Sequence, residues 1–410
     1  MVEATLGWNN TEKRQENKDM KKHWILALVV IATLLLNPLI ASATPANNPI
    51  ETYALDRILV KFQPGTDEAA QTSIHQKHGG QVVEAIPGID VKVVKVPRGK
   101  VLEKVKAYLS EGSVKFAELD GIVQATVVPN DPGFGNQWGM TKIQADKAWD
   151  ITSGSSSIKI AILDTGIDQN HPDLSSKIVA NKNFTRSRTV DDKYGHGTHV
   201  AGIAAAITNN GIGVAGVGYN SSLMNVKVLG DNGAGFNSWI AKGITWATDN
   251  GAKVINMSLG GGSSSSTVQN AVNYAWSKGV VIVAAAGNNN SSSLFYPAAY
   301  PNVISVAATD QNDAKASFSN YGSWVTVSAP GVDIYSTLPN HTNAIGQLNY
   351  GYLSGTSMAS PHVAGLAALI FARYPTWTNA DVRGRIQSST YPTTGFSPSL
   401  GRINAYKAVQ

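Results

Sequence analysis

Short apolar strands alternate with helical stretches from residue 158 onward, and this alternation narrows the possible folds more than any other feature. Strands are predicted at residues 158–163, 225–228, 254–257, 280–285, 303–307 and 324–327. Helices are predicted between several of them, at residues 198–207, 238–249 and 266–278. Strands that alternate with helices form a mostly parallel sheet with helices on both faces. We therefore expect an α/β domain that binds its ligand outside the carboxyl ends of its strands.

A smaller unit precedes this domain. Two strands are predicted at residues 57–62 and 91–97, where apolar and polar residues alternate as in half-buried strands. Two helices are predicted at residues 67–78 and 101–109. These patterns predict a small βαβ-type, ferredoxin-like α+β domain over about residues 56–126. A proline-rich junction at residues 127–133 ends it.

The N-terminal region has the pattern of an export signal. A basic segment leads into an apolar run of about a dozen residues, 25–36, which is followed by Ala41-Ser42-Ala43. Basic region, short apolar run and small-residue cleavage site together indicate a secretory signal peptide. The run is too short for a transmembrane helix, which needs about 20 apolar residues. We expect a leader and signal peptide over residues 1–43, with Met20 as the true start, and a secreted product.

Composition excludes several kinds of chemistry. The net charge is only +5, and no basic block is interleaved with aromatic residues, which argues against a nucleic-acid partner. No glutamate follows Glu118, and the chain from Val127 onward holds 18 Lys and Arg against 14 Asp, so its two parts are expected to differ in role. The absence of cysteine excludes disulfides, thiolate zinc sites and a thiol nucleophile. A secreted chain without disulfides needs other means of stabilisation, such as bound ions.

Ser357 lies in a stretch of small residues, Gly355-Thr356-Ser357-Met358, at the start of an apolar helical run. This arrangement puts its hydroxyl in the first helical turn, beside unpaired backbone N–H groups and the positive end of the helix dipole. Such a serine is either a helix cap or a nucleophile. Taken alone, the pattern favours a cap, because serine is a preferred N-cap residue.

Two further segments decide between these alternatives. Asp164 ends the strand at residues 158–163, and by itself it would be a turn residue. His196 and His199 open a helix and are three positions apart, so a metal pair is conceivable, but the HExxH pattern of zinc proteases is absent. The residues Asp164, His196 and Ser357 each lie at a strand end or a helix start. Such positions converge on one edge of an α/β sheet, where a nucleophile, a base and an orienting acid could meet.

The three segments around these residues resemble the signatures of the subtilisin-like serine peptidases: 164–168, 196–202 and 355–361. The resemblance extends from about Pro129 to the C-terminus, and its motifs are most similar to those of thermitase-type members. It implies Ser357 as nucleophile, His196 as base, Asp164 as the orienting acid and Asn288 as the side-chain donor to the oxyanion. It also implies a calcium-stabilised serine endopeptidase of broad specificity.

The resemblance further implies how a substrate would bind. Two segments would pair with an extended peptide, Gly233-Ala234-Gly235 and Ser258-Leu259-Gly260. The segment Ala285-Ala286-Gly287 would form the other wall of the pocket for the substrate side chain before the scissile bond, the S1 pocket. At the base of that pocket the family often carries a small residue, where this chain has Phe295. A phenyl ring there would make the pocket shallow and disfavour large aromatic side chains.

A structural calcium ion is implied in the same way. Its ligands would be the side chains of Asp131, Asp173 and Asn210 and the carbonyls of Ile207, Ile212 and Val214. All of these are oxygen donors, which a hard cation requires. Relatives of the thermitase type hold a second ion in the loop that corresponds to residues 183–192. Arg186 and Arg188 replace the expected acids in this loop, so the second site is expected to be weakened or lost.

The domain before the junction resembles the propeptide of the family, which acts as folding template and inhibitor. We expect a propeptide at residues 44–126, which the enzyme itself removes by cleavage near Thr126/Val127. The remaining peptidase, residues 127–410, is expected to be a monomer that acts on protein and peptide substrates. We expect it to have no membrane anchor once the signal peptide is cleaved. A permanent regulatory domain is the alternative for the first part. For the second part, the alternatives are a catalytically silent binding module and a metal hydrolase built on His196 and His199.

Overall fold

A computed structural model describes residues 53–122 and 128–410, which belong to two compact units. The predicted signal peptide, the start at Met20 and the predicted cleavage site at Thr126/Val127 lie outside the described residues. Among the helices of the described ranges, none is both long enough and apolar enough to cross a bilayer.

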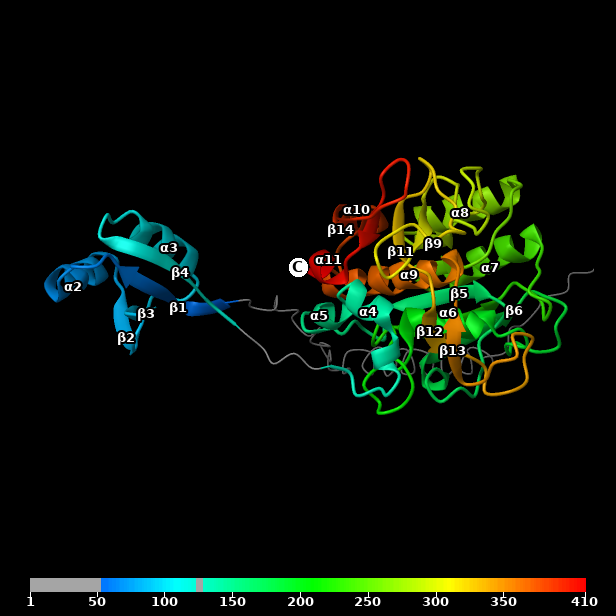
Figure 1. Cartoon of the computed structure of the whole chain (residues 1–410), viewed down its shortest axis with the longest axis horizontal. Coiled ribbons are helices and arrows are strands. Elements are labelled where there is room, and N and C mark those ends of the chain that lie inside the picture. Colours follow the sequence, from blue (N-terminus) through cyan, green and yellow to red (C-terminus); the bar gives the residue numbers. More distant parts are fainter. Residues whose placement is uncertain (1–52, 123–127) are drawn as a thin grey trace, which may run out of the picture. The chain divides into compact units, whose positions relative to one another are not determined.

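The first unit is a four-stranded antiparallel sheet with two helices (Figure 1). Its elements are β1 (Tyr53–Phe62), α2 (Glu68–Lys77), β2 (Gln81–Ile86), β3 (Val91–Lys95), α3 (Val101–Leu109) and β4 (Val114–Gly121). The spatial order β2-β3-β1-β4 with this chain order is the ferredoxin-like arrangement that the sequence predicts. The sequence patterns missed β2 and β4. In β2 the neighbouring Val82 and Val83 are 41% and 50% exposed, so the strand lacks the alternation of a half-buried strand.

The second unit is built on a nine-stranded sheet in the order β14-β15-β11-β10-β9-β8-β5-β7-β6. All neighbouring strands in it are parallel except β14 and β15. The strands are β5 (Lys159–Asp164), β6 (Ile178–Asn183), β7 (Ser222–Lys227), β8 (Val254–Met257), β9 (Val281–Ala285), β10 (Val303–Thr309), β11 (Val327–Pro330), β14 (Thr390–Pro392) and β15 (Gly401–Ile403). The expected mostly parallel sheet is confirmed.

Helices cover both faces of this sheet (Figure 1). The longer ones are α6 (His196–Ala205), α7 (Asn237–Asp249), α8 (Ser266–Ser277), α9 (Thr356–Arg373) and α10 (Asn379–Ser388). Side chains of β5 alternate between two cores: Ile160 and Ile162 pack in the cluster with α6 and α9, and Ala161 and Leu163 in the cluster with α7 and α8. The central strand is therefore buried on both sides, which explains its unbroken apolar sequence.

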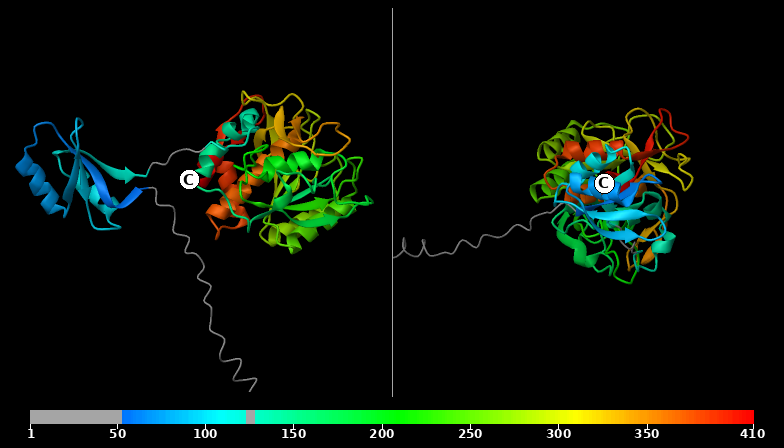
Figure 2. Two further views of the ribbon diagram at one scale, coloured as in Figure 1. Left: turned by 90° about the horizontal axis from the view of Figure 1, so that it is seen from below. Right: turned by 90° about the vertical axis from the view of Figure 1, so that its left-hand side faces the viewer.

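The edges of the unit differ most from the prediction. The strand predicted at residues 324–327 is β11, which begins only at Val327. The sequence did not predict the edge strands β6 and β14, the neighbouring strand β15, or a separate antiparallel pair, β12 (Ile334–Thr337) and β13 (Tyr350–Leu353). These strands are short or partly exposed, so they lack a long apolar signature. The C-terminal helix α11 (Ala405–Val409) packs against α5 (Ala145–Trp149), close to the start of the unit (Figures 1 and 2).

Candidate active site

The predicted site residues lie just beyond the carboxyl ends of neighbouring parallel strands. Asp164 is the last residue of β5, Ser258 follows β8, and the segment that leads to Asn288 follows β9. His196 and Ser357 lie in the first turns of α6 and α9. Because the strands are adjacent in the sheet, their carboxyl ends share one edge, as expected for an α/β domain.

His196 and Asp164 form a direct contact. His196 Nδ1 lies 2.7 Å from Asp164 Oδ1, and the Asp164 side chain is fully buried while that of His196 is 20% exposed. Burial alone would lower the pKa of His196, but the charge of Asp164 and its hydrogen bond outweigh burial and raise that pKa above its ordinary value. Because Nδ1 donates to a carboxylate, the neutral ring carries its basic lone pair on Nε2.

Asp192 fixes this pair in place. Its carboxylate accepts hydrogen bonds from the Thr165 hydroxyl (2.8 Å) next to Asp164 and from Gly195 N (2.8 Å) next to His196. Thr198 also donates its backbone N and its hydroxyl to Asp192, each at 2.8 Å. A buried carboxylate at the N-terminus of α6 suits the positive end of that helix. Sequence reasoning considered Asp192 only as part of a weakened cation loop, and its role as an anchor depends on residues distant in sequence.

Ser357 does not cap its helix. The N-cap residue of α9 is Gly355, which has no side chain to cap with. The Ser357 hydroxyl instead donates to the Ser258 carbonyl (3.2 Å), and the Ser258 hydroxyl donates back to the Ser357 carbonyl (2.7 Å). In this structure the hydroxyl of Ser357 is thus turned to Ser258 rather than to His196. Catalytic hydrogen bonds of this kind often form only when substrate is bound.

Asn288 lies beside the start of α9. Its Oδ1 accepts from the backbone N and from the hydroxyl of Thr356, both at 2.9 Å. With Oδ1 held in this way, the Nδ2 donor is left for the cavity that Asn288 and Ser357 both line. Thr356 is therefore the residue that orients the amide. It was not predicted, although it lies within the motif around Ser357.

Two adjoining cavities run along this edge of the sheet. The larger, of about 630 Å³, is lined by His196, by residues 233–235 and by residues 258–260. The smaller, of about 170 Å³, is lined by Leu259, Gly260, Ala285, Gly287, Asn288, Phe295 and Ser357, among others. Of the residues predicted to line the substrate site, Ala286 differs: it is fully buried in the core.

Phe295 closes one end of the smaller cavity. A Cβ atom placed on Gly260 would lie 2.4 Å from Phe295 Cε1, and one placed on Gly287 would lie 3.0 Å from Phe295 Cγ. The ring is therefore wedged against two glycines that belong to opposite walls. Phe295 thus lines the smaller cavity, and its effect on the depth of the S1 pocket stays a prediction.

The structure brings together the residues predicted to hold calcium: Asp131, Asp173, Ile207, Asn210, Ile212 and Val214. Asp131 and Asp173 are buried. Asn210 connects them, since its backbone N donates to Asp131 Oδ1 (3.1 Å) and its Nδ2 to Asp173 Oδ1 (2.8 Å). Burial, helped by the charge of Asp131, raises the pKa of Asp173 to about 6. Two buried carboxylates without a cation are unfavourable neighbours, so the cluster suits a hard cation.

The loop of the second predicted ion is held by hydrogen bonds instead. Asn183 Nδ2 donates to the carbonyls of Ser187 (2.8 Å) and Thr189 (3.2 Å), and its Oδ1 accepts from Thr185 N (2.8 Å). An amide donor thus points at carbonyls that would otherwise be free to bind a cation. The weakened or lost second site stays a prediction.

His199 does not pair with His196 around a metal. It is fully buried in α6, and its Nε2 lies 3.2 Å from the carbonyl of Gly351. Burial lowers the pKa of His199 to about 3, so it remains neutral. Within the ranges 53–122 and 128–410, the only group of three ligating His, Asp or Glu side chains includes neither of these histidines.

Comparison with known proteins agrees with this geometry. Residues 155–403 match the subtilase family, and residues 41–120 match the fervidolysin N-terminal prodomain. A thermophilic serine proteinase from Bacillus sp. strain AK1 is 41% identical over 95% of this chain and all of its own length. Thermitase from Thermoactinomyces vulgaris is 51% identical, over 69% of this chain and 99% of its own.

A solved structure is similar as well. It is a protease from Pseudoalteromonas arctica that is 38% identical and superposes with a TM-score of 0.64, over 69% of this chain and 99% of that one. The fold, the convergence of residues at one sheet edge and these similarities lead to one conclusion. The chain is a serine endopeptidase with a subtilisin-like fold and belongs to the subtilase family.

Proposed function

We propose that the chain is a secreted, calcium-stabilised endopeptidase of broad specificity in which Asp164, His196, Ser357 and Asn288 carry the reaction. The observation that carries this proposal is the 2.7 Å contact between His196 and the buried Asp164, at the sheet edge where α9 presents Ser357. A neutral imidazole with its lone pair on Nε2 is the base that a serine hydroxyl needs.

The reaction follows from these groups. The hydroxyl of Ser357 turns from the Ser258 carbonyl to His196, attacks the scissile carbonyl and transfers its proton to Nε2. Asp164 stabilises the imidazolium, which then protonates the leaving amine. The backbone N of Ser357 and Nδ2 of Asn288 stabilise the oxyanion. Water repeats the sequence on the acyl-enzyme and releases the acid product.

Substrate recognition would rely on the backbone of the two cavity edges, 233–235 and 258–260. An extended peptide adds to such edges by main-chain hydrogen bonds, which are nearly independent of its side chains. Broad specificity follows, with selection concentrated where the smaller cavity takes up one side chain.

Labelling with a serine-directed phosphonyl fluoride tests the proposal. We expect one adduct per chain on Ser357 and complete loss of casein hydrolysis, because only an activated serine reacts. Mass spectrometry of tryptic peptides locates the adduct. A chain that hydrolyses casein while Ser357 stays unlabelled, and that only a chelator inhibits, would be a metal hydrolase instead. A folded chain with neither activity nor labelling would be a silent binding module.

Phe295 is proposed to restrict the side chain that precedes the scissile bond. We expect the wild-type enzyme to cleave after Ala or Leu in preference to Phe, and Phe295→Gly to raise kcat/KM for Phe relative to Ala at least about 10-fold, the effect of small changes in apolar pockets. A peptide library that varies this position measures both. Leu294→Ala is the control, because this exposed neighbour does not line the cavity. A wild-type preference for Phe would contradict the proposal.

Calcium is proposed as the structural ion, held by the cluster around Asp131, Asp173 and Asn210. Chelation with EDTA is expected to lower the Tm of the inhibitor-blocked enzyme by several degrees, since an ion at 100 times its Kd stabilises by about 2.7 kcal/mol. Asp173→Asn should lower the Tm and abolish its dependence on calcium. The surface change Asp249→Asn should retain that dependence. A Tm that EDTA leaves unchanged would rule out the ion.

The first unit is proposed to be a propeptide that guides folding and inhibits the enzyme until it is removed. The prodomain match over residues 41–120 and the compact ferredoxin-like sheet support this role. Its own core is small, with Ile58, Phe62 and Tyr108 among its buried side chains. Removal near Thr126/Val127 would leave a monomeric peptidase domain that starts at about residue 127.

A further inference from the structure

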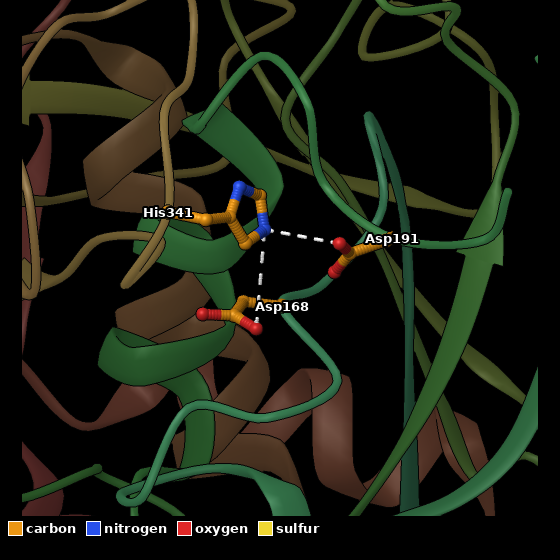
Figure 3. Close-up of side chains that lie close together, drawn as sticks. All are labelled: Asp168, Asp191 and His341. Atoms are coloured by element: carbon orange, nitrogen blue, oxygen red, sulfur yellow. Dashed lines mark ion pairs between the residues drawn. The ribbon is translucent and has the colours of Figure 1, made fainter.

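Three side chains from distant parts of the sequence meet outside the substrate cavities (Figure 3). Asp168 belongs to the segment that follows β5, Asp191 to the segment before α6, and His341 to the connection between β12 and β13. One atom of the imidazole, Nε2, faces both carboxylates. It lies 3.0 Å from Asp191 Oδ2 and 4.0 Å from Asp168 Oδ1.

His341 Nε2 has an ion-pair contact with Asp191 but makes no hydrogen bond. Its other nitrogen, Nδ1, lies 3.1 Å from the carbonyl of Thr342, which only accepts, so Nδ1 carries a proton. Nε2 is fully buried and has no partner in hydrogen-bond geometry. A lone pair that faces two carboxylates is repelled by them. The three atoms converge on one point, as the ligands of a metal ion do.

We propose that Asp168, Asp191 and His341 bind a divalent transition-metal ion such as Zn²⁺ through Oδ1, Oδ2 and Nε2. Zinc bonds of 2.0–2.2 Å at tetrahedral angles place ligand atoms roughly 3.4 Å apart. The two distances from Nε2, 3.0 and 4.0 Å, fall on either side of this value. All three ligand atoms lie within 4.8 Å of one another, so they would draw closer around a bound ion.

Neighbouring groups orient the ligands as they do in metal sites. Asp168 Oδ2 accepts from Asn340 N (2.8 Å), and Asp191 Oδ1 accepts from Gln169 N (3.2 Å). The bond from His341 Nδ1 to a carbonyl fixes the tautomer that leaves Nε2 free for a metal. Lys193 pairs with Asp191 Oδ2 at 3.2 Å and would have to move, which its 45% exposed side chain permits.

The ligand set favours zinc over calcium. Calcium takes six to eight oxygen ligands, whereas one imidazole and two carboxylates suit zinc and its neighbours in the first transition row. With three protein ligands, a water molecule would complete the tetrahedron.

Such an ion would connect three chain segments beside the candidate active site. The segment of Asp168 continues from Asp164, and the segment of Asp191 leads to His196. The connection that carries His341 already pairs with the latter through two backbone bonds of 3.1 Å, Ala344 N to Lys193 O and Ile345 N to Tyr194 O. Metal binding is therefore expected to stabilise this connection against the segment that leads into α6.

Titration calorimetry with Zn²⁺ tests the site. The protein is the wild-type enzyme blocked with a phosphonyl fluoride, in buffer with calcium, so that self-digestion and the proposed calcium site do not interfere. We expect one Zn²⁺ per chain with micromolar Kd and a rise in Tm. His341→Ala should weaken binding at least about 10-fold and remove the rise in Tm. Thr342→Ala, a change in the same loop that keeps its backbone carbonyl, should bind as the wild type does.

Cobalt gives a second readout, because Co²⁺ in a tetrahedral site with a nitrogen ligand absorbs visible light. We expect this absorption in the wild-type protein and its loss in His341→Ala. Absence of Zn²⁺ binding up to millimolar concentration would overturn the proposal. Equal binding by His341→Ala would place the ion elsewhere and overturn it too.

Discussion

Ser357→Ala is expected to abolish peptide hydrolysis and to leave the precursor uncleaved. The substitution removes the proposed nucleophile but leaves α9 and its glycine cap unchanged. In subtilisin the loss of the equivalent serine lowers kcat about 10⁶-fold, and we expect an effect of that order. The remaining activity over water comes from the oxyanion donors and from substrate binding.

Gel electrophoresis and mass spectrometry of the purified variant measure both effects, and circular dichroism shows whether it has folded. Ser354→Ala is the matched control. The hydroxyl of Ser354 contacts Asp333 rather than the cavities, so this variant should process itself and remain active. Efficient processing of Ser357→Ala, purified away from other proteases, would show that the propeptide is not removed by this enzyme itself.

Asn288→Leu is expected to lower kcat about 10²–10³-fold, or 2.7–4 kcal/mol, while KM changes little. This is the range for the equivalent donor in subtilisin, the example on which the estimate rests. The amide is proposed to stabilise charge that exists only in the transition state, so its loss should affect the chemical step rather than binding.

Thr356→Val separates the donor from the residue that orients it. The variant removes one of the two hydrogen bonds to Asn288 Oδ1 and keeps the bond from the backbone N. We expect a smaller fall in kcat than for Asn288→Leu, again with little change in KM. Steady-state kinetics on one peptide substrate compare both variants with the wild type. A rise in KM at constant kcat would assign Asn288 to ground-state binding instead.

The sequence predicted the parts of the fold that have a continuous local signature. The strand β5 could be recognised because it is buried on both faces, and α9 because its apolar run is long. The edge strands β6 and β14 could not, since half-exposed short strands resemble loops. Ser357 remained ambiguous on its local residues alone, because a cap and a nucleophile occupy the same helical turn. Its predicted partners, Asp164, His196 and Asn288, led to the prediction of a nucleophile.

The parts of the site that could not be predicted depend on contacts between segments that are distant in sequence. Asp192 anchors two segments through five short hydrogen bonds, but nothing in its own surroundings in sequence distinguishes it from a loop carboxylate. His341 meets Asp168 and Asp191 only because the chain returns to this edge between β12 and β13. No sequence motif indicates such a contact.

The connection between β12 and β13 also affects how readily the enzyme digests itself. A peptidase of broad specificity attacks any loop, including its own, that can detach and extend through a substrate cleft. This connection is bound near its ends, by Leu338 N to Asn349 O, and in its middle, by Ile345 N to Tyr194 O. Cleavage by a second molecule must first break these bonds. We therefore expect the pairing that holds this loop to lengthen the half-life of the enzyme at high concentration.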